Sequence, residues 1–462
     1  MAWLARALFL GSLIFIAIYR VESIAQVSGQ RLSSRLVTDF QHALDHDPEW
    51  LAAIASRDAS VEAYPQAKAA LLPQIGFNAQ RSQNSTDSST QTQVGPLTRN
   101  FDNYPASSTV LQVRQALIRP KLWASLTQSK AQVRFAEQSF VAAKQDLALR
   151  LFSIHAELYA GKQAIDALSK QLAIQEKLSE SALRQFLAGD SGRVDFELSR
   201  AQEHQLRAQL RQAHLEQENL LLSRRELTGI SDSFEALTFD VDTAFKLLGS
   251  LGSSTEHWID LAMRESPNVL AQIAAVDASR EEIRKAGFDH YPTADLYASR
   301  SASKSAMDNT IGTAFRTAQI GMQLSIPVYA GGAVESSIRK AQASLRLAEQ
   351  QLEATRAKIR LQIERDFRIL EVSREELSAQ REVQKALVLT LNAAIKGLRA
   401  GSSVVSEQLK IGSQLEDVQR RIARSNANAL IAWARLLSVA NRLRHDELQE
   451  VERLALQRQP SG

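Results

Sequence analysis

The chain has 462 residues, with 55 Lys and Arg against 51 Asp and Glu, and no cysteine. The charges nearly cancel and form no block, which excludes the usual nucleic-acid binder with basic residues gathered on one face. Without cysteine, disulfides, thiolate metal sites and acylation of an N-terminal cysteine are excluded as well. The abundance of Gln, Ala, Leu, Arg, Glu and Ser, with only 10 prolines, is typical of coiled-coil helices.

The first residues have the pattern of an export signal. Arg6 gives a positive start, an apolar run without charge extends from Ala7 to Tyr19, and Ser23-Ile24-Ala25 offers the small residues that a signal peptidase reads. We therefore predict a signal peptide over residues 1–25. An uncleaved anchor is disfavoured because a span needs roughly 20 apolar residues. No other stretch reaches that length, so a membrane crossing would have to be a β-barrel.

The sequence repeats itself. Pro48, Asp58-Ala59-Ser60, Pro73 and Arg81-Ser82 recur 219 residues later, whereas Ala136-Glu137-Gln138 and Ala188-Gly189 recur 212 residues later. The offset changes once, within a stretch that is rich in Ser, Thr, Gln and Asn and is therefore expected to be a loop. Two halves of one architecture thus differ mainly in the length of one loop.

The first repeat is expected over residues 26–228. Its first helix is predicted from about Pro48 to Leu72, with a kink at Pro65. The remaining elements are predicted in this order: strand 74–82, a polar loop over 83–105, strand 109–117, long helix 121–188 and return helix 194–227. Residues 229–255, rich in Ser, Asp and Gly, are a predicted connecting segment.

The second repeat is expected over residues 256–443, before a tail over 444–462. It has a helix from about Pro267 to Gly287, then strand 293–302, a loop, strand 314–326, long helix 333–400 and return helix 404–443. Each long helix contains no proline and one interior glycine. Each would be about 100 Å long at 1.5 Å per residue, a length that belongs to coiled coils rather than to compact domains.

Apolar and polar residues alternate along the predicted strands with period two, as expected between lipid and a watery lumen. The predicted lipid-facing residues are Ile75, Phe77, Ile320, Met322 and Leu324, and Asn78, Gln319 and Gln323 are predicted to face water. The same alternation suits a half-buried soluble sheet. Since the smallest membrane barrels have about eight strands, four strands would need strands from further copies.

Two junctions carry a resemblance to a known family. Residues 110–117 (VLQVRQAL) with 119–123 (RPKLW), and residues 321–332 (GMQLSIPVYAGG), resemble the strand-to-helix junctions of TolC-like outer-membrane efflux and secretion channels. Residues 41–44 with Asp47-Pro48, and residues 71–74, resemble the branch that serves type I secretion and protease export. The resemblance extends from about Val37 to Leu443.

This resemblance implies the fold and the setting. The expected fold class is mainly α with a transmembrane β-barrel: a homotrimeric channel-tunnel with four strands per protomer in a 12-stranded barrel. The expected location is the outer membrane, with coiled-coil helices extending into the periplasm. The implied partners are outer-membrane lipid, a periplasmic adaptor (membrane fusion) protein, an inner-membrane ABC transporter and an exported polypeptide, and no nucleic acid is expected.

The resemblance also implies candidate sites at the two helical hairpins. Gly189, Gly192, Gly401 and Ser402 lie at the tips that meet the adaptor in the family. Asp195 stands at an acidic position of the family's closing network, but Ser403 and Leu398 replace the usual arginine and tyrosine. Glu407 and Lys410 occupy positions where some members carry two acidic residues. Alternatively, these two simply pair at i, i+3 on a solvated face.

Enzymatic functions find no support in the sequence. His42 and His46 with Asp45 and Asp47 have metal-ligand spacing, but a solvated helix start explains them equally well. The histidines of the later helices, such as His155, His204 and His214, have no matching carboxylate in the sequence nearby. We find no nucleophile motif, phosphate loop or cofactor fingerprint, and expect no enzyme and no cofactor. The remaining alternatives are a multidrug efflux duct and a periplasmic coiled-coil scaffold without a pore.

Overall fold

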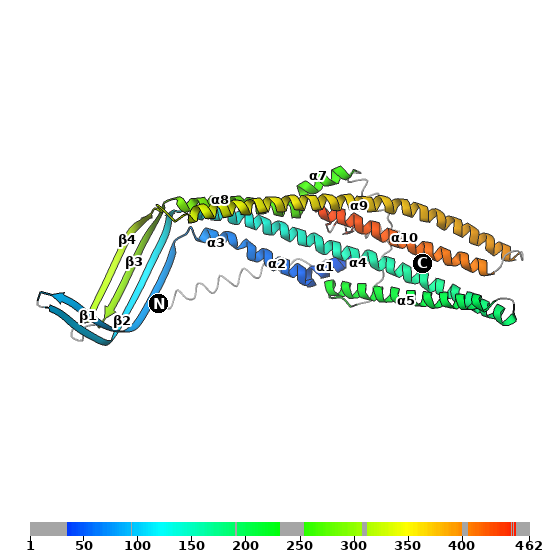
Figure 1. Ribbon diagram of the computed structural model, residues 1–462, viewed down its shortest axis with the longest axis horizontal. Helices are drawn as coiled ribbons and strands as arrows, with labels where there is room; N and C mark the ends of the chain where they lie inside the picture. Colours follow the sequence, from blue (N-terminus) through cyan, green and yellow to red (C-terminus); the bar gives the residue numbers. More distant parts are fainter. Residues whose placement is uncertain are drawn as a thin grey trace, which may run out of the picture. The chain divides into compact units, whose positions relative to one another are not determined.

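The structure is a computed structural model that describes residues 35–93, 95–189, 192–231, 254–306, 312–399, 405–444, 446, 448 and 449 (Figure 1). The predicted signal peptide lies outside these residues, as do most of the predicted connecting segment and tail. The chain divides into two compact units, Met1–Arg35 and Leu36–Gly462, and the elements below belong to the second apart from the first residue of α1.

The first half of the chain begins with three short helices. They are α1 (Arg35–His46), α2 (Pro48–Val61) and α3 (Ala63–Ala69). Asp47 caps α2 by accepting a hydrogen bond from the Trp50 N–H at 3.1 Å, and Pro48 occupies its first turn. The helix α1 was not predicted, and His42 and His46 lie in it rather than at the start of α2.

The helix predicted over Pro48–Leu72 with a kink at Pro65 is observed as two helices, because α2 ends at Val61 and α3 runs from Ala63 to Ala69. Pro65 explains the break. In a continuous helix Pro65 would have no N–H to donate to the carbonyl of Val61, four residues earlier, and its ring would clash with that same carbonyl.

Two hairpins and two pairs of long helices complete the chain. The elements of the first half are β1 (Gln74–Thr92), β2 (Gly95–Ile118), α4 (Pro120–Ala188) and α5 (Arg193–Thr228). Those of the second half are α7 (Thr255–Glu265), α8 (Pro267–Gly287), the 3-10 turn η1 (Phe288–His290), β3 (Thr293–Ser305), β4 (Thr313–Ser325), α9 (Ala333–Arg399) and α10 (Val405–Val439). The order helix, two strands, long helix, return helix thus occurs twice.

The four strands form one antiparallel sheet in the order β1-β2-β3-β4. All four strands join helices at the same end of the sheet, where Gln74, Ile118, Thr293 and Ser325 lie. We call this the helix end and the opposite end, where the hairpins turn, the turn end (Figure 1).

The predicted loop over residues 83–105 is wrong. β1 and β2 remain paired from Gln74↔Arg114 to Thr92↔Gly95, with one irregularity between Asn84 and Thr86. Apart from Leu97, Phe101 and Tyr104, the paired residues of this extension are mostly polar. They therefore lack the alternation by which strands are predicted, but ladder hydrogen bonds join backbones whatever the side chains. The threonines also suit exposed strands.

The core lies along the middle of α4, where α8, α9 and α10 pack against it or against one another. Fully buried members include Leu151, Phe152, Ile363, Trp433 and Leu437. The rings of Phe152 and Trp433 lie 6.0 Å apart. Each such side chain contributes about 1.5–3 kcal/mol by leaving water. Among the described residues, no helix is long and apolar enough to cross a membrane.

Candidate functional site

The register of the sheet separates its side chains into two faces, since residues directly opposite each other in an antiparallel ladder point the same way. Ile75 pairs with Val113, Val113 with Ala298, and Ala298 with Ile320. The next row on either side adds more apolar residues. We call this the apolar face, which comprises Ile75, Phe77, Leu111, Val113, Leu296, Ala298, Ile320, Met322 and Leu324.

The five predicted lipid-facing residues therefore share one face, and all are exposed in the single chain. Ile320 is 78% exposed and Ile75 is 72% exposed. Large apolar side chains so exposed and so contiguous mark a surface that meets lipid or protein rather than water.

The opposite, polar face carries the residues predicted to contact water. Asn78, Gln319 and Gln323 lie on it, together with Gln112, Arg114, Asp295 and Ser299. Apolar or aromatic residues lie on this face as well: Val110 in the row of Asn78, Tyr297 in the row of Arg114, and the exposed Phe315 in the row of Gln80. The fourth strand is an edge of the sheet, and so is the first.

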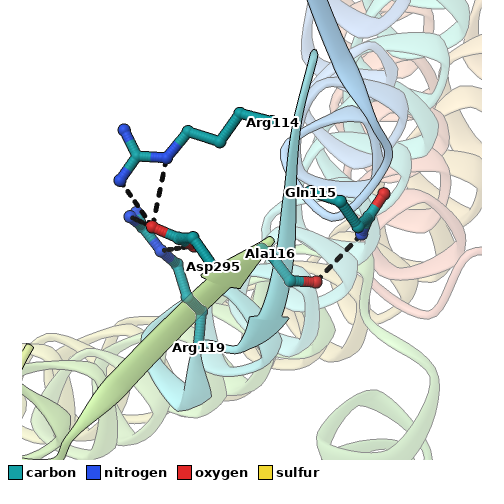
Figure 2. Close-up of polar contacts among 5 residues, drawn as sticks. All are labelled: Arg114, Gln115, Ala116, Arg119 and Asp295. Carbon is teal, nitrogen blue, oxygen red and sulfur yellow. Dashed lines mark hydrogen bonds and ion pairs between the residues drawn. The ribbon is translucent and has the colours of Figure 1, made fainter. Parts of the chain in front are cut away.

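A carboxylate at the helix end of the polar face holds the sheet to α4 (Figure 2). Asp295, with a side chain only 5% exposed, accepts hydrogen bonds from Arg114 Nε at 3.1 Å and from Arg119 Nε at 2.8 Å. Arg119 is the residue before α4, so its bond to β3 fixes the direction in which the helix leaves the sheet. Charged hydrogen bonds of this kind are among the stronger ones in proteins.

Sequence reasoning missed this cluster because Asp295 is more than 170 residues from both arginines. The pairing of Ala116 with Asp295 brings them together, and register is not visible in the sequence. Nearby, Gln115 Nε2 donates to the carbonyls of Leu71 and Ala116, at 2.7 and 2.9 Å.

The junction over residues 321–332 has a geometric need for its glycines. A Cβ on Gly321 would lie 2.8 Å from the hydroxyl of Tyr297, the residue opposite it in β3. Gly331 and Gly332 have φ of +61° and +80°, which L-residues with side chains rarely adopt. The glycines thus admit a tyrosine ring at the sheet and turn the chain into α9.

The tip between α4 and α5 matches the predicted hairpin. Gly189 ends α4 in the left-handed conformation (φ +80°), and Gly192 precedes α5. Asp195 lies in the first turn of α5, where a negative charge favours the helix N-terminus. Asp195 has no ion pair with the residues that the structure describes. Leu187 and Val194 flank this turn and are 74% and 78% exposed.

Residues 400–404, at the tip between α9 and α10, lie outside the described residues. They include Gly401, Ser402 and Ser403, and nothing is described of the Leu398 side chain. Glu407 is in the first turn of α10, and Lys410 follows within the same helix and is exposed. The structure thus places both on one helix but does not bring them to Asp195 in any described contact.

Two buried ionisable groups in the helical region were not predicted. Asp39 of α1 binds Arg224 of α5 and lies 2.9 Å from Nε2 of His155 in α4, so the expectation that His155 lacks a carboxylate is wrong. Asp366 of α9 is 1% exposed and lies 3.8 Å from Arg435 of α10. Arg435 also lines a cavity of about 670 Å³, together with Arg365, Arg368 and Arg424.

Comparison with known proteins fits this arrangement. The profile described as "Outer membrane efflux protein" matches residues 40–229 and 258–442. The chain belongs to the outer membrane efflux protein family. It is accordingly an outer-membrane protein of a family of transport channels, as predicted. In the described residues, no three His, Cys, Asp or Glu gather as metal ligands.

The relatives include two proteins named for protease secretion and one named as an outer membrane protein. The chain is 25% identical to the alkaline protease secretion protein AprF of Pseudomonas aeruginosa, over 90% of this chain and 86% of AprF. It is 25% identical to the proteases secretion protein PrtF of Dickeya chrysanthemi, over 92% of this chain and 91% of PrtF. It is 24% identical to the outer membrane protein TolC of Vibrio cholerae, over 91% and 93%.

Solved structures share the fold. The outer membrane protein VceC of Vibrio cholerae superposes with a TM-score of 0.72 at 16% identity, covering 88% of this chain and 96% of VceC. The outer membrane channel CmeC of Campylobacter jejuni gives 0.71 at 13% identity, covering 94% of each chain. The predicted fold class, that of a TolC-like channel-tunnel protomer with four strands, is confirmed.

Proposed function

We propose that three copies of this chain form the outer-membrane exit duct of a type I secretion system. In this duct an unfolded polypeptide passes from an inner-membrane ABC transporter and a periplasmic adaptor to the exterior. The duct itself is passive, since nothing in the described residues points to a nucleotide or catalytic site. The relatives AprF and PrtF, both named for protease secretion, favour a protein, such as a protease, as the cargo.

The observation that carries the proposal is the four-stranded sheet with one apolar and one polar face. In a bilayer, every backbone N–H and C=O of the edge strands must find a partner, because each unpaired group costs several kcal/mol. Within one chain, β1 and β4 have free edges. Pairing β4 of one copy with β1 of the next satisfies both edges, and three copies supply the 12 strands of a closed barrel.

In this barrel the two faces of the sheet lie in different environments. The apolar face meets lipid, and the polar face lines the water-filled passage. Trp123, Tyr291 and Tyr329 are exposed just beyond the helix end of the sheet, where aromatic side chains with polar tips mark the membrane–water interface. The long helices α4 and α9 continue from that end, and together with the return helices α5 and α10 they form the periplasmic tunnel.

The domain boundaries follow from this assignment. Residues 1–25 direct export and are removed, residues 26–228 and 256–443 are the two structural repeats, and residues 229–255 connect them. The hairpin tips at Gly189, Gly192, Gly401 and Ser402 meet the adaptor. Asp195, Leu398, Ser403, Glu407 and Lys410 lie at or near the closed entrance.

A multidrug efflux duct is the second candidate, favoured by the likeness to TolC. A strain that lacks this chain separates the two. We expect loss of one or a few secreted proteins from the medium, restored by the wild-type chain, with unchanged susceptibility to dyes and detergents. Sensitivity to such compounds with normal protein secretion would contradict type I secretion and favour efflux.

A periplasmic coiled-coil scaffold without a pore is the remaining alternative. The chain has no cysteine, so single cysteines report on their surroundings without background. We expect Gln319→Cys to react with a water-soluble thiol reagent in outer-membrane vesicles and Ile320→Cys to be protected. Equal reaction of both would contradict a sheet placed between lipid and water.

A further inference from the structure

Three basic side chains, Arg81, Lys304 and Arg316, follow the apolar band on the same face of the sheet, and a fourth, Arg300, lies in the last row of that band beside Leu111. Arg81 and Lys304 occupy one row, Arg81–Ser107–Lys304–Ala314, near the turn end. Arg316 lies in the next row towards the helix end, opposite Ala302, and Arg300 lies in the row after that, opposite Ala318. The face thus changes from apolar to cationic along the strands.

These side chains are close enough to act on one ligand. Diagonal neighbours on one face of an antiparallel pair lie about 7–8 Å apart, which relates Lys304 to Arg316 and Arg316 to Arg300. Arg81 lies two strands from Lys304, about 10 Å at a strand spacing near 4.8 Å. Arg81, Ser107 and Lys304 also line one hollow of about 460 Å³, with a hydroxyl between the two cations.

The cluster has no neutralising partner in the described structure. All four side chains are exposed, and none forms an ion pair with a described residue. The apolar face of β3 and β4, and the rows of β1 and β2 paired to it, carry no carboxylate, since Asp295 lies on the polar face. Like charges gathered on one face repel one another unless an anion joins them.

The position of the cluster matches the depth of a membrane surface. Ten residues of β3 separate the row of Ala294 from the row of Lys304. This is about 34 Å along the strand, or about 26 Å along the membrane normal for strands tilted near 40°. Outward-facing apolar bands of such barrels are about 25 Å tall, so Arg81 and Lys304 reach the headgroup level when Leu324 lies at the opposite surface.

We propose that Arg81, Lys304 and Arg316, with Arg300 extending towards them, bind the phosphate groups of a lipid in the outer leaflet. Arginine matches phosphate through paired hydrogen bonds, and long basic side chains reach a headgroup while their stems stay in apolar surroundings. The apolar band beneath the cluster receives the acyl chains of the same lipid. The inference rests on the membrane placement of the sheet proposed above.

The test uses the full mature chain, purified as assembled trimers in non-ionic detergent. A fluorescent lipid A with two phosphates is titrated against the same lipid with both phosphates removed. We expect the phosphorylated lipid to bind at least about tenfold more tightly, as expected for one or two charged hydrogen bonds. Arg81→Gln with Lys304→Gln should abolish this preference.

A matched control removes one arginine and one lysine elsewhere. Arg339→Gln with Lys340→Gln, both exposed on α9, should keep the preference for phosphate. If the first double variant fails to assemble, the single variants Arg81→Gln and Lys304→Gln carry the test, each with a partial loss. Inorganic phosphate should not displace the lipid any better than chloride at equal ionic strength.

Three results would overturn the inference: wild-type preference in the Arg81→Gln, Lys304→Gln variant, equal loss in the control variant, or displacement by inorganic phosphate, which would make the site one for free anions. Assembly is measured on the same samples by the migration of unheated protein on gels. Chains that never form detergent-stable trimers contradict the proposed function, whereas assembled trimers without a phosphate preference contradict only this inference.

Discussion

Two buried carboxylates in the helical region have opposite pKa shifts because their partners differ. Burial raises the pKa of Asp39, but hydrogen bonds from His155 and Arg224 outweigh it and hold the pKa below its usual range. Burial likewise raises the pKa of Asp366, and the more distant Arg435 offsets it only in part, so that the pKa is about 6. Asp366 Oδ2 has no hydrogen-bond partner.

The first prediction concerns Asp39. Arg224→Met should lower the stability of the protein by about 3–5 kcal/mol, because it leaves the Asp39 charge buried without one of its two partners. The neighbouring Arg225 is exposed, so Arg225→Met should change stability little. Thermal unfolding of both variants checks this. Similar melting temperatures for the two would contradict a stabilising role of the Arg224–Asp39 pair.

The second prediction concerns pH. The folded pKa of Asp366, about 6, lies above its usual 3.8, so folding favours the protonated form. The stability that Asp366 contributes through this shift is fully present below pH 4. It is lost as pH rises from there through about 6, and the free energy of unfolding falls by about 3 kcal/mol in total. Asp366→Asn should therefore melt at a higher temperature than wild type at pH 7.5 and at a similar temperature at pH 4. A constant difference at both pH values would count against this account.

The helices and strands differ in how well the sequence predicts them. The helix predicted over 121–188 is observed as Pro120–Ala188, and that over 333–400 as Ala333–Arg399, because uninterrupted helix formers end at a glycine. The hairpin over residues 83–105 was predicted as a loop, since polar residues on both faces leave no period to detect. The break at Val61 depends on one proline whose effect reaches four residues back.

The candidate site was predictable where it depends on alternation and unpredictable where it depends on register. Ile75, Phe77, Ile320, Met322 and Leu324 were placed on one face from local pattern alone. The Arg114–Asp295–Arg119 cluster and the row of Arg81 and Lys304 arise only when β2 and β3, nearly 200 residues apart in the chain, pair in a defined register.

The third prediction tests the two faces with neighbouring residues of β4. Ile320→Arg should reduce the yield of detergent-stable trimers, because an arginine on the lipid face near the bilayer midplane costs about 2–4 kcal/mol. Gln319→Arg should assemble nearly as well as wild type, since its side chain points to water. The comparison uses equal expression and unheated gels, and equal loss in both variants would reject the assigned faces.

At the scale of the whole molecule, the need for several copies follows from strand number and open edges, both visible in one chain. The copy number of three and the two partners, an adaptor and a transporter, are inferred from the family. They are not visible in one protomer, because it does not contain the surfaces of its partners. The cargo leaves no trace in the sequence for a related reason: a passive duct needs a wide polar lumen rather than a specific pocket.

The fourth prediction concerns the closed entrance. Asp195 has no ion pair with described residues, Leu187 and Val194 beside it are exposed and apolar, and an exposed ion pair is worth only about 0–1 kcal/mol. We expect apolar packing, including Leu398, to hold the entrance shut. In planar bilayers, Asp195→Ala should change the conductance weakly, and Ser403→Arg should lower it by linking to Asp195. A wide opening by Asp195→Ala alone would contradict this gate.

The central claim, a duct built from several copies that share one barrel, is tested most directly by the mass of the mature protein. Native mass spectrometry of protein extracted from outer membranes should give three copies of the chain, stable in detergent and separated by heat. A monodisperse, water-soluble single chain of full mature length would contradict the claim, because its apolar face and its open β1 and β4 edges would then need neither lipid nor a second copy.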